Sequence, residues 1–116
     1  MITPGPRNLK CEYFFNPLGI DPTTPRLSWQ LSDTRRGARQ TAYEIAAAST
    51  LDILQSKPDL WHTRRITSSL CLDIPYSGKK LNSRKSVWWR VRTWDQDRQV
   101  SDWSEPACFE IGLLRT

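Results

Sequence analysis

The feature that most constrains the fold is a strict alternation of side-chain character between Val87 and Asp95. Every second residue suits a core, and the residues between are large or charged: Val87, Trp89, Val91 and Thr93 against Trp88, Arg90, Arg92 and Trp94. Successive side chains of a β-strand point to opposite faces, whereas a helix groups residues three or four apart. The segment is therefore predicted to be a long strand with Trp89 in the core.

The same alternation recurs along the chain, between segments that favour turns. Leu27, Trp29 and Leu31 share one face of another predicted strand, which puts Trp29 in the core as well. The predicted strands cover residues 9–14, 26–32, 41–49, 60–62, 69–76, 87–95 and 108–113. Strands spaced by roughly 8–12 residues with turns between them indicate an all-β sandwich.

Two segments carry more specific predictions. In residues 69–76 the apolar side chains of Leu70, Leu72, Ile74 and Tyr76 alternate, so all four are expected on the core face. Residues 46–55 combine an alanine run with Ser49-Thr50, a pair of residue types that cap helices. A single helical turn is therefore expected between two strands.

Composition narrows the classes of protein. The 116 residues, 38% hydrophobic and 25% charged, suit one globular domain and not a disordered chain. No apolar run approaches the roughly 20 residues of a membrane helix, so no membrane partner is expected. The net charge is +5, but the basic residues are scattered, so nucleic acid is not expected either. The three separated cysteines indicate neither a metal site nor another cofactor, and they leave their pairing open.

Ordered motifs over nearly the whole chain carry a resemblance. They are Leu9–Tyr13, Asn16–Asp21, Pro25–Trp29, Gln40–Ile45, Asp59–Trp61, Trp89–Asp95, Ser101–Glu105 and Phe109–Leu113. This pattern resembles the N-terminal domain of bacterial α-L-rhamnosidases. The resemblance implies an all-β, fibronectin type III-like (immunoglobulin-like) sandwich of seven strands. In that family the domain precedes a carbohydrate-binding jelly roll and an α/α barrel that holds the catalytic acids.

The resemblance also sets expected boundaries. Residues 1–8 are expected to be an N-terminal tail, 9–113 the sandwich, and 114–116 the start of a linker to a following domain. One position departs from the family: Val87 stands where a tyrosine usually forms a tyrosine corner. A valine cannot donate that hydrogen bond, so the corner must be absent or replaced by packing.

No catalytic residue is predicted in this chain. A glycosidase needs two carboxylates across a cleft, one with a raised pKa. The candidate carboxylates are expected at turns or on outward faces, with ordinary pKa values: Glu44, Asp73, Asp95, Asp97 and Glu105. The single histidine, His62, is expected to be solvated on an edge strand, because no partner for metal binding or nucleophilic chemistry lies near it in the sequence.

The outward face of residues 87–95 is the candidate site. Ser101-Asp102-Trp103-Ser104 resembles the second half of the WSxWS element of cytokine-receptor domains, in which a Trp lies between Arg side chains. Arg90, Arg92 and Trp103 are therefore predicted to form a structural cation–π ladder. Trp88 and Trp94 are outside that ladder, and they are candidates for a ligand-binding or interdomain surface.

These observations predict a non-catalytic N-terminal domain of a larger α-L-rhamnosidase. Its expected partners are the following domains of the same polypeptide, with a plant-derived carbohydrate as a second candidate. One alternative is a carbohydrate-binding module that uses exposed Trp residues. Another is a protein-interaction domain of the fibronectin type, although such extracellular domains usually carry disulfides.

The sequence leaves two locations open, the bacterial cytoplasm and the periplasm. The cluster Arg35, Arg36 and Arg39 is interpreted as a solvated loop.

Overall fold

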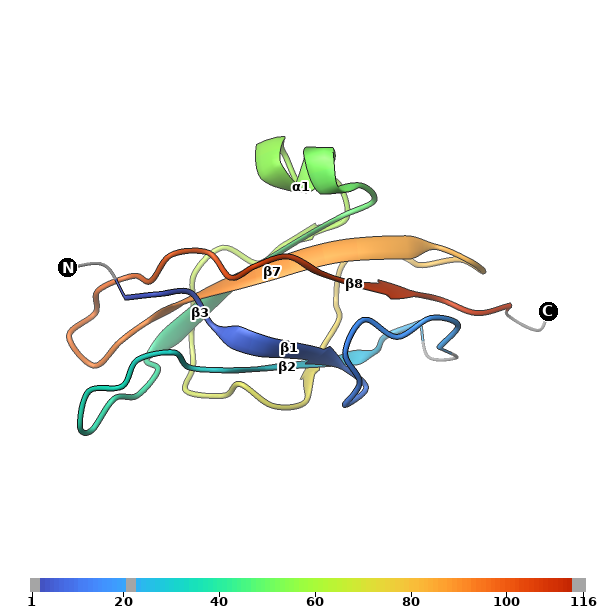
Figure 1. Cartoon of the computed structure of the whole chain (residues 1–116). Coiled ribbons are helices and arrows are strands. Elements are labelled where there is room, and N and C mark those ends of the chain that lie inside the picture. Colours follow the sequence, from blue (N-terminus) through green and yellow to red (C-terminus); the bar gives the residue numbers. More distant parts are fainter. Residues whose placement is uncertain (1–2, 21–22, 114–116) are drawn as a thin grey trace.

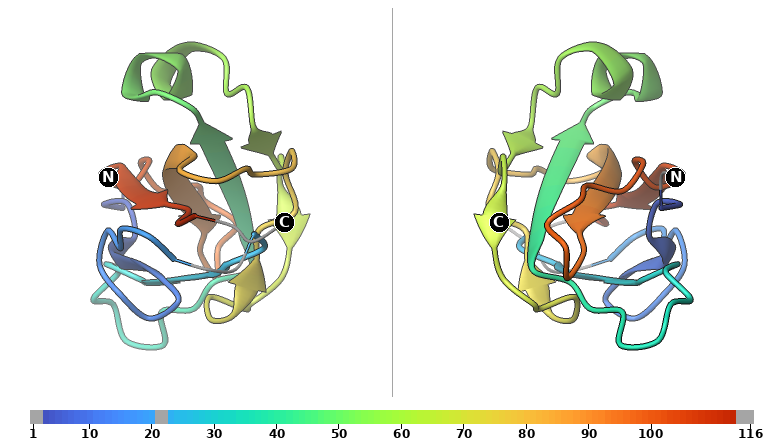
Figure 2. Two further views of the ribbon diagram at one scale, coloured as in Figure 1. Left: turned by 90° about the vertical axis from the view of Figure 1, so that its right-hand side faces the viewer. Right: turned by 90° about the vertical axis from the view of Figure 1, so that its left-hand side faces the viewer.

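The computed structural model describes residues 3–20 and 23–113, and it shows two β-sheets packed face to face (Figures 1 and 2). The three-stranded sheet has the order β1 (Arg7–Cys11), β2 (Arg26–Gln30) and β6 (Ile74–Pro75). The larger sheet has the order β4 (Trp61–His62), β3 (Ala42–Ala48), β7 (Ser86–Trp94) and β8 (Ala107–Glu110). A further short strand, β5 (Ile66–Thr67), also pairs with β3.

The fold class is the predicted one, an immunoglobulin-like sandwich. The described residues form eight strands, and all the pairings between these strands are antiparallel. Both β4 and β5 pair with β3, whose other neighbour is β7, so they amount to one interrupted edge strand. The strand count is therefore close to the predicted seven.

The centre of the larger sheet is the pair β3–β7. Seven residue pairs follow one another in register, from Ala42 opposite Trp94 to Ala48 opposite Trp88. The inward residues of β7 are buried and its outward residues half-buried, as the alternation predicts. Every residue of β3 is buried, because helix α1 (Leu51–Ser56) and the side chains of β7 cover its outer face. Figure 1 shows α1 standing on that face, and Thr50 caps it by accepting a hydrogen bond from the Ile53 amide.

Two tryptophans lie in the core, as predicted. Trp29 is 2% exposed and Trp89 1% exposed. Their polar atoms differ in environment: the Trp29 indole Nε1 donates to Oε1 of Gln40 at 2.9 Å, whereas Nε1 of Trp89 is buried without a partner. The Gln40 amide in turn donates to the carbonyl oxygens of Ser68 and Leu70, so one buried side chain joins two loops to the core.

The prediction for residues 69–76 was wrong in part. Ile74 and Tyr76 are buried, but Leu70 and Leu72 are 62% and 56% exposed, and the strand has only two residues. Asp73 has a φ of 58°, a left-handed conformation that interrupts the alternation of faces. Only the residues after this break therefore follow the strand pattern.

The position of the missing tyrosine corner is filled by packing. Val87 is fully buried in the main core cluster. A tyrosine hydroxyl bond to the backbone exists elsewhere, because the Tyr76 hydroxyl donates to the Lys79 carbonyl at 2.7 Å.

The N-terminal end of the domain differs from the expected boundary. Strand pairing begins at Arg7, within the segment expected to be a tail, and the Thr3 carbonyl accepts a hydrogen bond from the Asp102 amide. The linker expected at 114–116 lies outside the described residues.

All three cysteines are free, and burial, with a smaller effect of the Glu12 charge, raises the pKa of Cys11 to about 12.

The two core tryptophans provide a matched test of the buried Gln40. Trp29→Phe leaves Oε1 of Gln40 without its donor, whereas Trp89→Phe removes an indole N–H that has no partner. Both variants lose similar volume, so we expect Trp29→Phe to lower the free energy of unfolding by about 1–3 kcal/mol more than Trp89→Phe. Denaturant unfolding of both variants measures this difference, and equal losses would contradict the role given to Gln40.

Candidate functional site

The three predicted ladder residues lie together on the outer face of β7. The guanidinium carbons of Arg90 and Arg92 lie 4.4 and 4.6 Å from the ring centroid of Trp103. These distances are within the range of a cation–π interaction. Nε of Arg90 is buried without a hydrogen-bond partner, and burial, followed by repulsion from Arg92, lowers the pKa of Arg90. The Trp103 ring and the Glu44 charge, which opposes the lowering of this pKa, thus both stabilise the Arg90 charge.

Two serines hold Trp103 in this place. The amides of Ser101 and Ser104 donate to the carbonyls of Thr93 and Val91 at 2.8 and 2.9 Å. In the reverse direction, the Thr93 and Val91 amides donate to the serine hydroxyls at 3.1 and 3.0 Å. The two serine hydroxyls therefore accept the β7 amide hydrogen bonds that backbone carbonyls of a paired strand would otherwise accept. Trp103 lies between the two serines in sequence, so its ring is held over Arg90 and Arg92. This role of the serines was not predicted, although the Ser-x-x-Ser spacing is a signal for it in the sequence.

The ladder is longer than predicted. Trp94 lies between Arg92, at 5.7 Å from its ring centroid, and Arg65, at 5.4 Å. The order of groups is thus Arg65, Trp94, Arg92, Trp103 and Arg90. Trp88 packs with Trp103 in a second apolar cluster under α1. Arg65 was missed because nothing in the local sequence places the segment between β4 and β5 beside β7.

Small residues on β3 leave space for this layer. Ala42, Ala46 and Ala48 lie directly opposite Trp94, Arg90 and Trp88. A larger residue at these positions would displace side chains of the ladder or of α1. The alanine run that suggested a helix therefore serves a strand whose outer face is covered.

One acid on β3 completes the site. Glu44 lies opposite Arg92, which donates to it from Nε at 2.7 Å, and Nε2 of His62 lies 2.6 Å from its other carboxylate oxygen. Burial would raise the pKa of Glu44, but these hydrogen bonds and the Arg92 charge outweigh burial and lower it. The acid is therefore held ionised beside the ladder.

Two sequence expectations are corrected here. Glu44 and Asp95 are only 6% and 8% exposed, so they are not outward carboxylates with ordinary environments. His62 is exposed on the edge strand β4, as expected, but it also contacts Glu44. Strand pairing brings His62 and Arg92 to Glu44, although all three are far apart in the sequence. Asp73, Asp97 and Glu105 are exposed, as expected.

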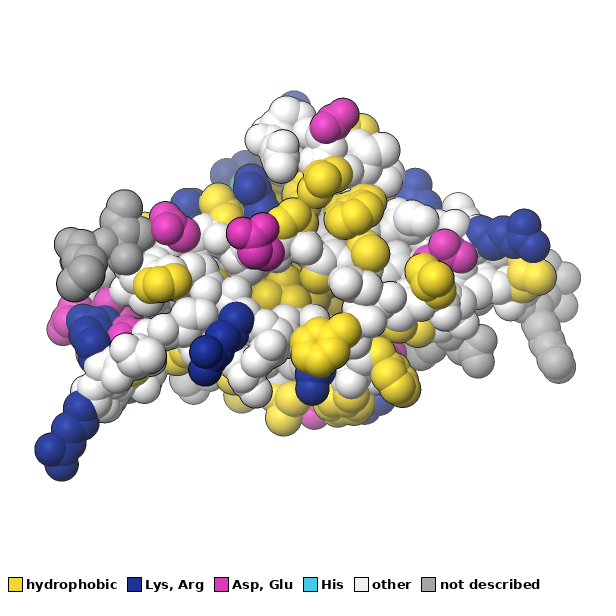
Figure 3. Space-filling view, viewed as in Figure 1, with side chains coloured by type: hydrophobic (Ala, Val, Ile, Leu, Met, Phe, Trp, Pro, Cys, Tyr) yellow, Lys and Arg dark blue, Asp and Glu magenta, His cyan; other side chains and the backbone are white. Residues whose placement is uncertain are grey.

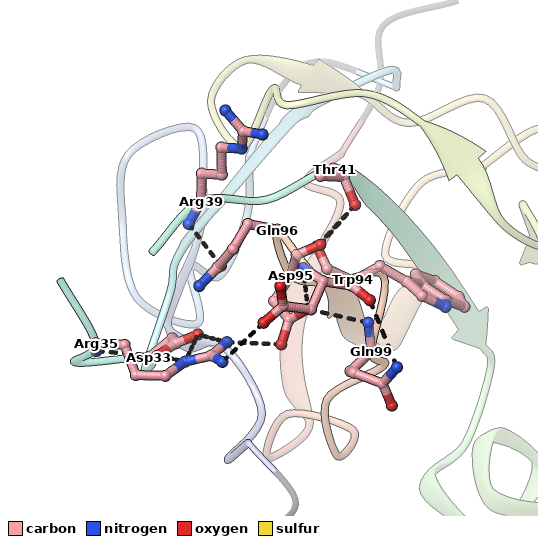
Figure 4. A network of polar contacts seen from close by, with 9 residues as sticks. Asp33, Arg35, Arg39, Thr41, Trp94, Asp95, Gln96 and Gln99 are labelled. Carbon is pink, nitrogen blue, oxygen red and sulfur yellow. Dashed lines mark hydrogen bonds and ion pairs between the residues drawn. The ribbon is translucent and has the colours of Figure 1, made fainter. Parts of the chain in front are cut away.

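The arginine loop before β3 is less free than its sequence suggests. Arg35 forms ion pairs with Asp33, Asp95 and Asp97, and Figure 4 shows its guanidinium among carboxylates at the end of β7. Burial would raise the pKa of Asp95, but the Gln99 and Asp97 amides and Arg35 lower it below its ordinary value. Asp95 and Arg35 thus hold the turn after β7 against the loop before β3. Because Arg35 is already paired with three carboxylates, it is poorly suited to bind an acidic ligand.

Other kinds of site receive no support from the residues described. Within residues 3–20 and 23–113 there is no group of three or more His, Cys, Asp or Glu side chains that could hold a metal ion. The one helix in this part of the chain is too short to cross a membrane.

The fold and this outer layer define an immunoglobulin-like domain. The family model described as the Rha78A-like, N-terminal immunoglobulin domain matches residues 6–115. The chain belongs to this family of N-terminal immunoglobulin domains.

Named relatives agree with that assignment. The chain is 43% identical over 111 residues to an α-L-rhamnosidase of Alteromonas sp. (strain LOR), covering 94% of the chain and 12% of the relative. It is 41% identical to an α-L-rhamnosidase of Streptomyces avermitilis, covering 89% of the chain and 10% of the relative. The chain therefore spans about a tenth of the length of these relatives.

Solved structures give the same result. The α-L-rhamnosidase from Dictyoglumus thermophilum matches with a TM-score of 0.90 and 40% identity, over 95% of this chain and 12% of that one. The Streptomyces avermitilis α-L-rhamnosidase complexed with L-rhamnose matches with a TM-score of 0.89 and 38% identity, over 93% and 10%. At these identities the similarity extends beyond the fold.

The ladder is expected to contribute to stability through Trp103. Trp103→Ala removes two cation–π contacts, those with Arg90 and Arg92, so we expect a loss of about 1–2 kcal/mol and a lower melting temperature. Trp103→Phe keeps an aromatic face and serves as the control, with a smaller loss. If Trp103→Ala leaves the melting temperature unchanged, the ladder contributes nothing.

Glu44 predicts a pH dependence. Its folded-state pKa is below the unfolded value, so its ionised form stabilises the fold at neutral pH, and this contribution disappears as the pH falls through the lowered pKa. Glu44→Gln should therefore be less stable by about 1–3 kcal/mol at pH 7, and the difference should shrink below a pH of about 4. Denaturant unfolding of both proteins across pH 2–7 tests this, and a difference that does not change with pH would refute it.

Proposed function

We propose that this chain is the non-catalytic N-terminal domain of a larger α-L-rhamnosidase, where it packs against the domain that follows and helps to position the catalytic unit. The observation that carries the proposal is the combination of family membership with coverage. The chain matches an N-terminal domain family over residues 6–115, yet it spans only about a tenth of relatives named α-L-rhamnosidase.

The electrostatics of the described carboxylates support a structural role. A glycosidase acid needs a raised pKa and a carboxylate partner across a cleft. The two buried acids, Glu44 and Asp95, instead each contact an arginine, and their pKa values are lowered. Both are suited to hold charge in place, and neither is suited to donate a proton near neutral pH.

The carbohydrate-binding alternative is weakened by the ladder. Stacking on a sugar requires an accessible aromatic face. Trp94 and Trp103 are each contacted by two guanidinium groups, and Trp88 packs in the cluster under α1. The tryptophans that suggested a platform are thus largely occupied by partners within the chain.

The first test is the mass and activity of the native gene product, captured with an antibody against this domain. We expect a polypeptide several times larger than 13.5 kDa that hydrolyses 4-nitrophenyl α-L-rhamnopyranoside. The purified 116-residue chain should release no nitrophenol from the same substrate. A native product near 13.5 kDa, or hydrolysis by the purified chain, would overturn the proposal.

A further inference from the structure

Four of the eight large apolar side chains that are exposed in the described residues lie on the loop that follows β1. Within six residues Tyr13, Phe14, Phe15 and Leu18 are 48%, 64%, 60% and 77% exposed. We call residues 13–18 the apolar loop. Figure 3 shows apolar side chains gathered around the right-hand end of β1, where this loop begins. Single exposed apolar residues are ordinary, but a cluster of this size on one loop marks an interaction site.

The backbone of the loop is fixed in place. Asn16 accepts a hydrogen bond from the Cys108 amide through its side chain, and the Pro17 carbonyl accepts one from the Glu110 amide. Further on, Ile20 exchanges hydrogen bonds with Glu110 and Gly112. The chain thus runs along the free edge of β8 and covers it. Its apolar side chains are exposed on a rigid support, so docking them costs little backbone entropy.

The turn that leads into the loop is strained and held by charged groups. Cys11 and Phe14 form a bridge across Glu12 and Tyr13, whose φ angles are 50° and 69°. Glycine and asparagine favour such positions, and other residues adopt them only at a cost in backbone strain.

Three contacts maintain this conformation. Glu12 accepts hydrogen bonds from the Arg26 amide and guanidinium, the Arg26 guanidinium lies 5.1 Å from the Tyr13 ring centroid, and the Tyr13 hydroxyl donates to Asp73. Such an arrangement maintains a strained turn that exposes aromatic rings, and the core gains nothing from that exposure. Strain of this kind is typical of functional sites.

We propose that the apolar loop docks against the domain that follows this one in the same polypeptide; this inference rests on the proposed function. The position of the C-terminal end of the domain supports that occupant. After β8 the chain runs beside the loop, where the Gly112 amide donates to the Ile20 carbonyl at 2.8 Å. A Cβ on Gly112 would lie only 2.9 Å from the Gly19 carbonyl oxygen, so the two segments are in close contact.

The next residue is also apolar and exposed. Leu113 is 69% exposed, and a domain attached beyond it would be tethered to a segment that is hydrogen-bonded to Ile20, two residues past the apolar loop. A short tether raises the effective concentration of a partner to the millimolar range, so a modest apolar interface is sufficient. In the named relatives roughly nine-tenths of the polypeptide lies outside the matched region, which supplies such a partner.

Cations beside the aromatic rings of the apolar loop indicate the charge expected on the partner surface. Nζ of Lys10 lies 4.9 Å from the Phe15 ring centroid, and Arg26 covers Tyr13. A complementary surface is therefore apolar at its centre and carries a carboxylate opposite Lys10, since Arg26 is already paired with Glu12. The inference places the interdomain contact on the loop after β1 and not on the outer face of β7, which carries Trp88 and Trp94.

Hydroxyl-radical footprinting tests the proposal without any variant. Oxidation of Tyr13, Phe14, Phe15 and Leu18 is measured by mass spectrometry in the native gene product and in the isolated 116-residue chain. We expect oxidation about 5-fold slower or more in the native product, because an interface core is desolvated. Leu70 and Val100 are the internal control, since both are exposed and lie near the other end of β7, and their rates should be equal in the two samples.

The variant Phe14→Ser/Phe15→Ser/Leu18→Ser gives a second readout, with Leu70→Ser/Val100→Ser as the matched control. The first variant should lower the melting temperature of this domain by about 5 °C or more in the native product and leave the isolated chain nearly unchanged. The control variant should have little effect in either.

The outcomes separate the two proposals. A native product near 13.5 kDa overturns both. A large product in which the loop oxidises as fast as in the isolated chain overturns only the docking inference. Protection that rises with the concentration of the isolated chain would assign the loop to a second copy of this chain, and it would also overturn docking to the following domain.

Discussion

The in-register pairing of β3 with β7 is the constraint on which the rest of the structure depends. It buries Trp89, Val91 and Thr93 on one side, and on the other it aligns small residues of β3 with large residues of β7. The remaining parts of the larger sheet attach to this pair: β8 on one side, and β4 and β5 on the other. The pairing of these two segments therefore determines the packing on both faces of the larger sheet: the core on the inner face, and the ladder and α1 on the outer face.

The ladder, together with α1, covers the outer face of the larger sheet. The outer face of β3 and β7 is not covered by another sheet, and yet it carries aromatic rings and two arginines. Stacking each guanidinium on a tryptophan desolvates both without requiring a carboxylate for every charge. Glu44 supplies one carboxylate, to Arg92, and the Trp103 ring compensates Arg90. Ser101 and Ser104 make this arrangement specific, since their hydroxyls determine where Trp103 crosses the strand.

The distribution of buried charge agrees with an accessory role. The buried acids are neutralised inside the fold by arginines. Exposed aromatic side chains lie instead on the loop that follows β1, where Tyr13 adopts a left-handed conformation. The proposed accessory role requires such a contact surface and no catalytic cleft.

Local pattern was sufficient for the two-layer class, the faces of β7 and the burial of Trp29 and Trp89, because period-two alternation and turn residues act over a few neighbouring positions. The resemblance to a known family supplied the expectation that Trp103 lies on Arg90 and Arg92. Only the tertiary structure brought His62 and Arg92 to Glu44, added Arg65 to the ladder, and exposed Leu70 and Leu72 through the left-handed Asp73. Those outcomes depend on which strands become neighbours and where the backbone breaks its alternation. Both are decided by contacts between residues far apart in the chain, which no local pattern encodes.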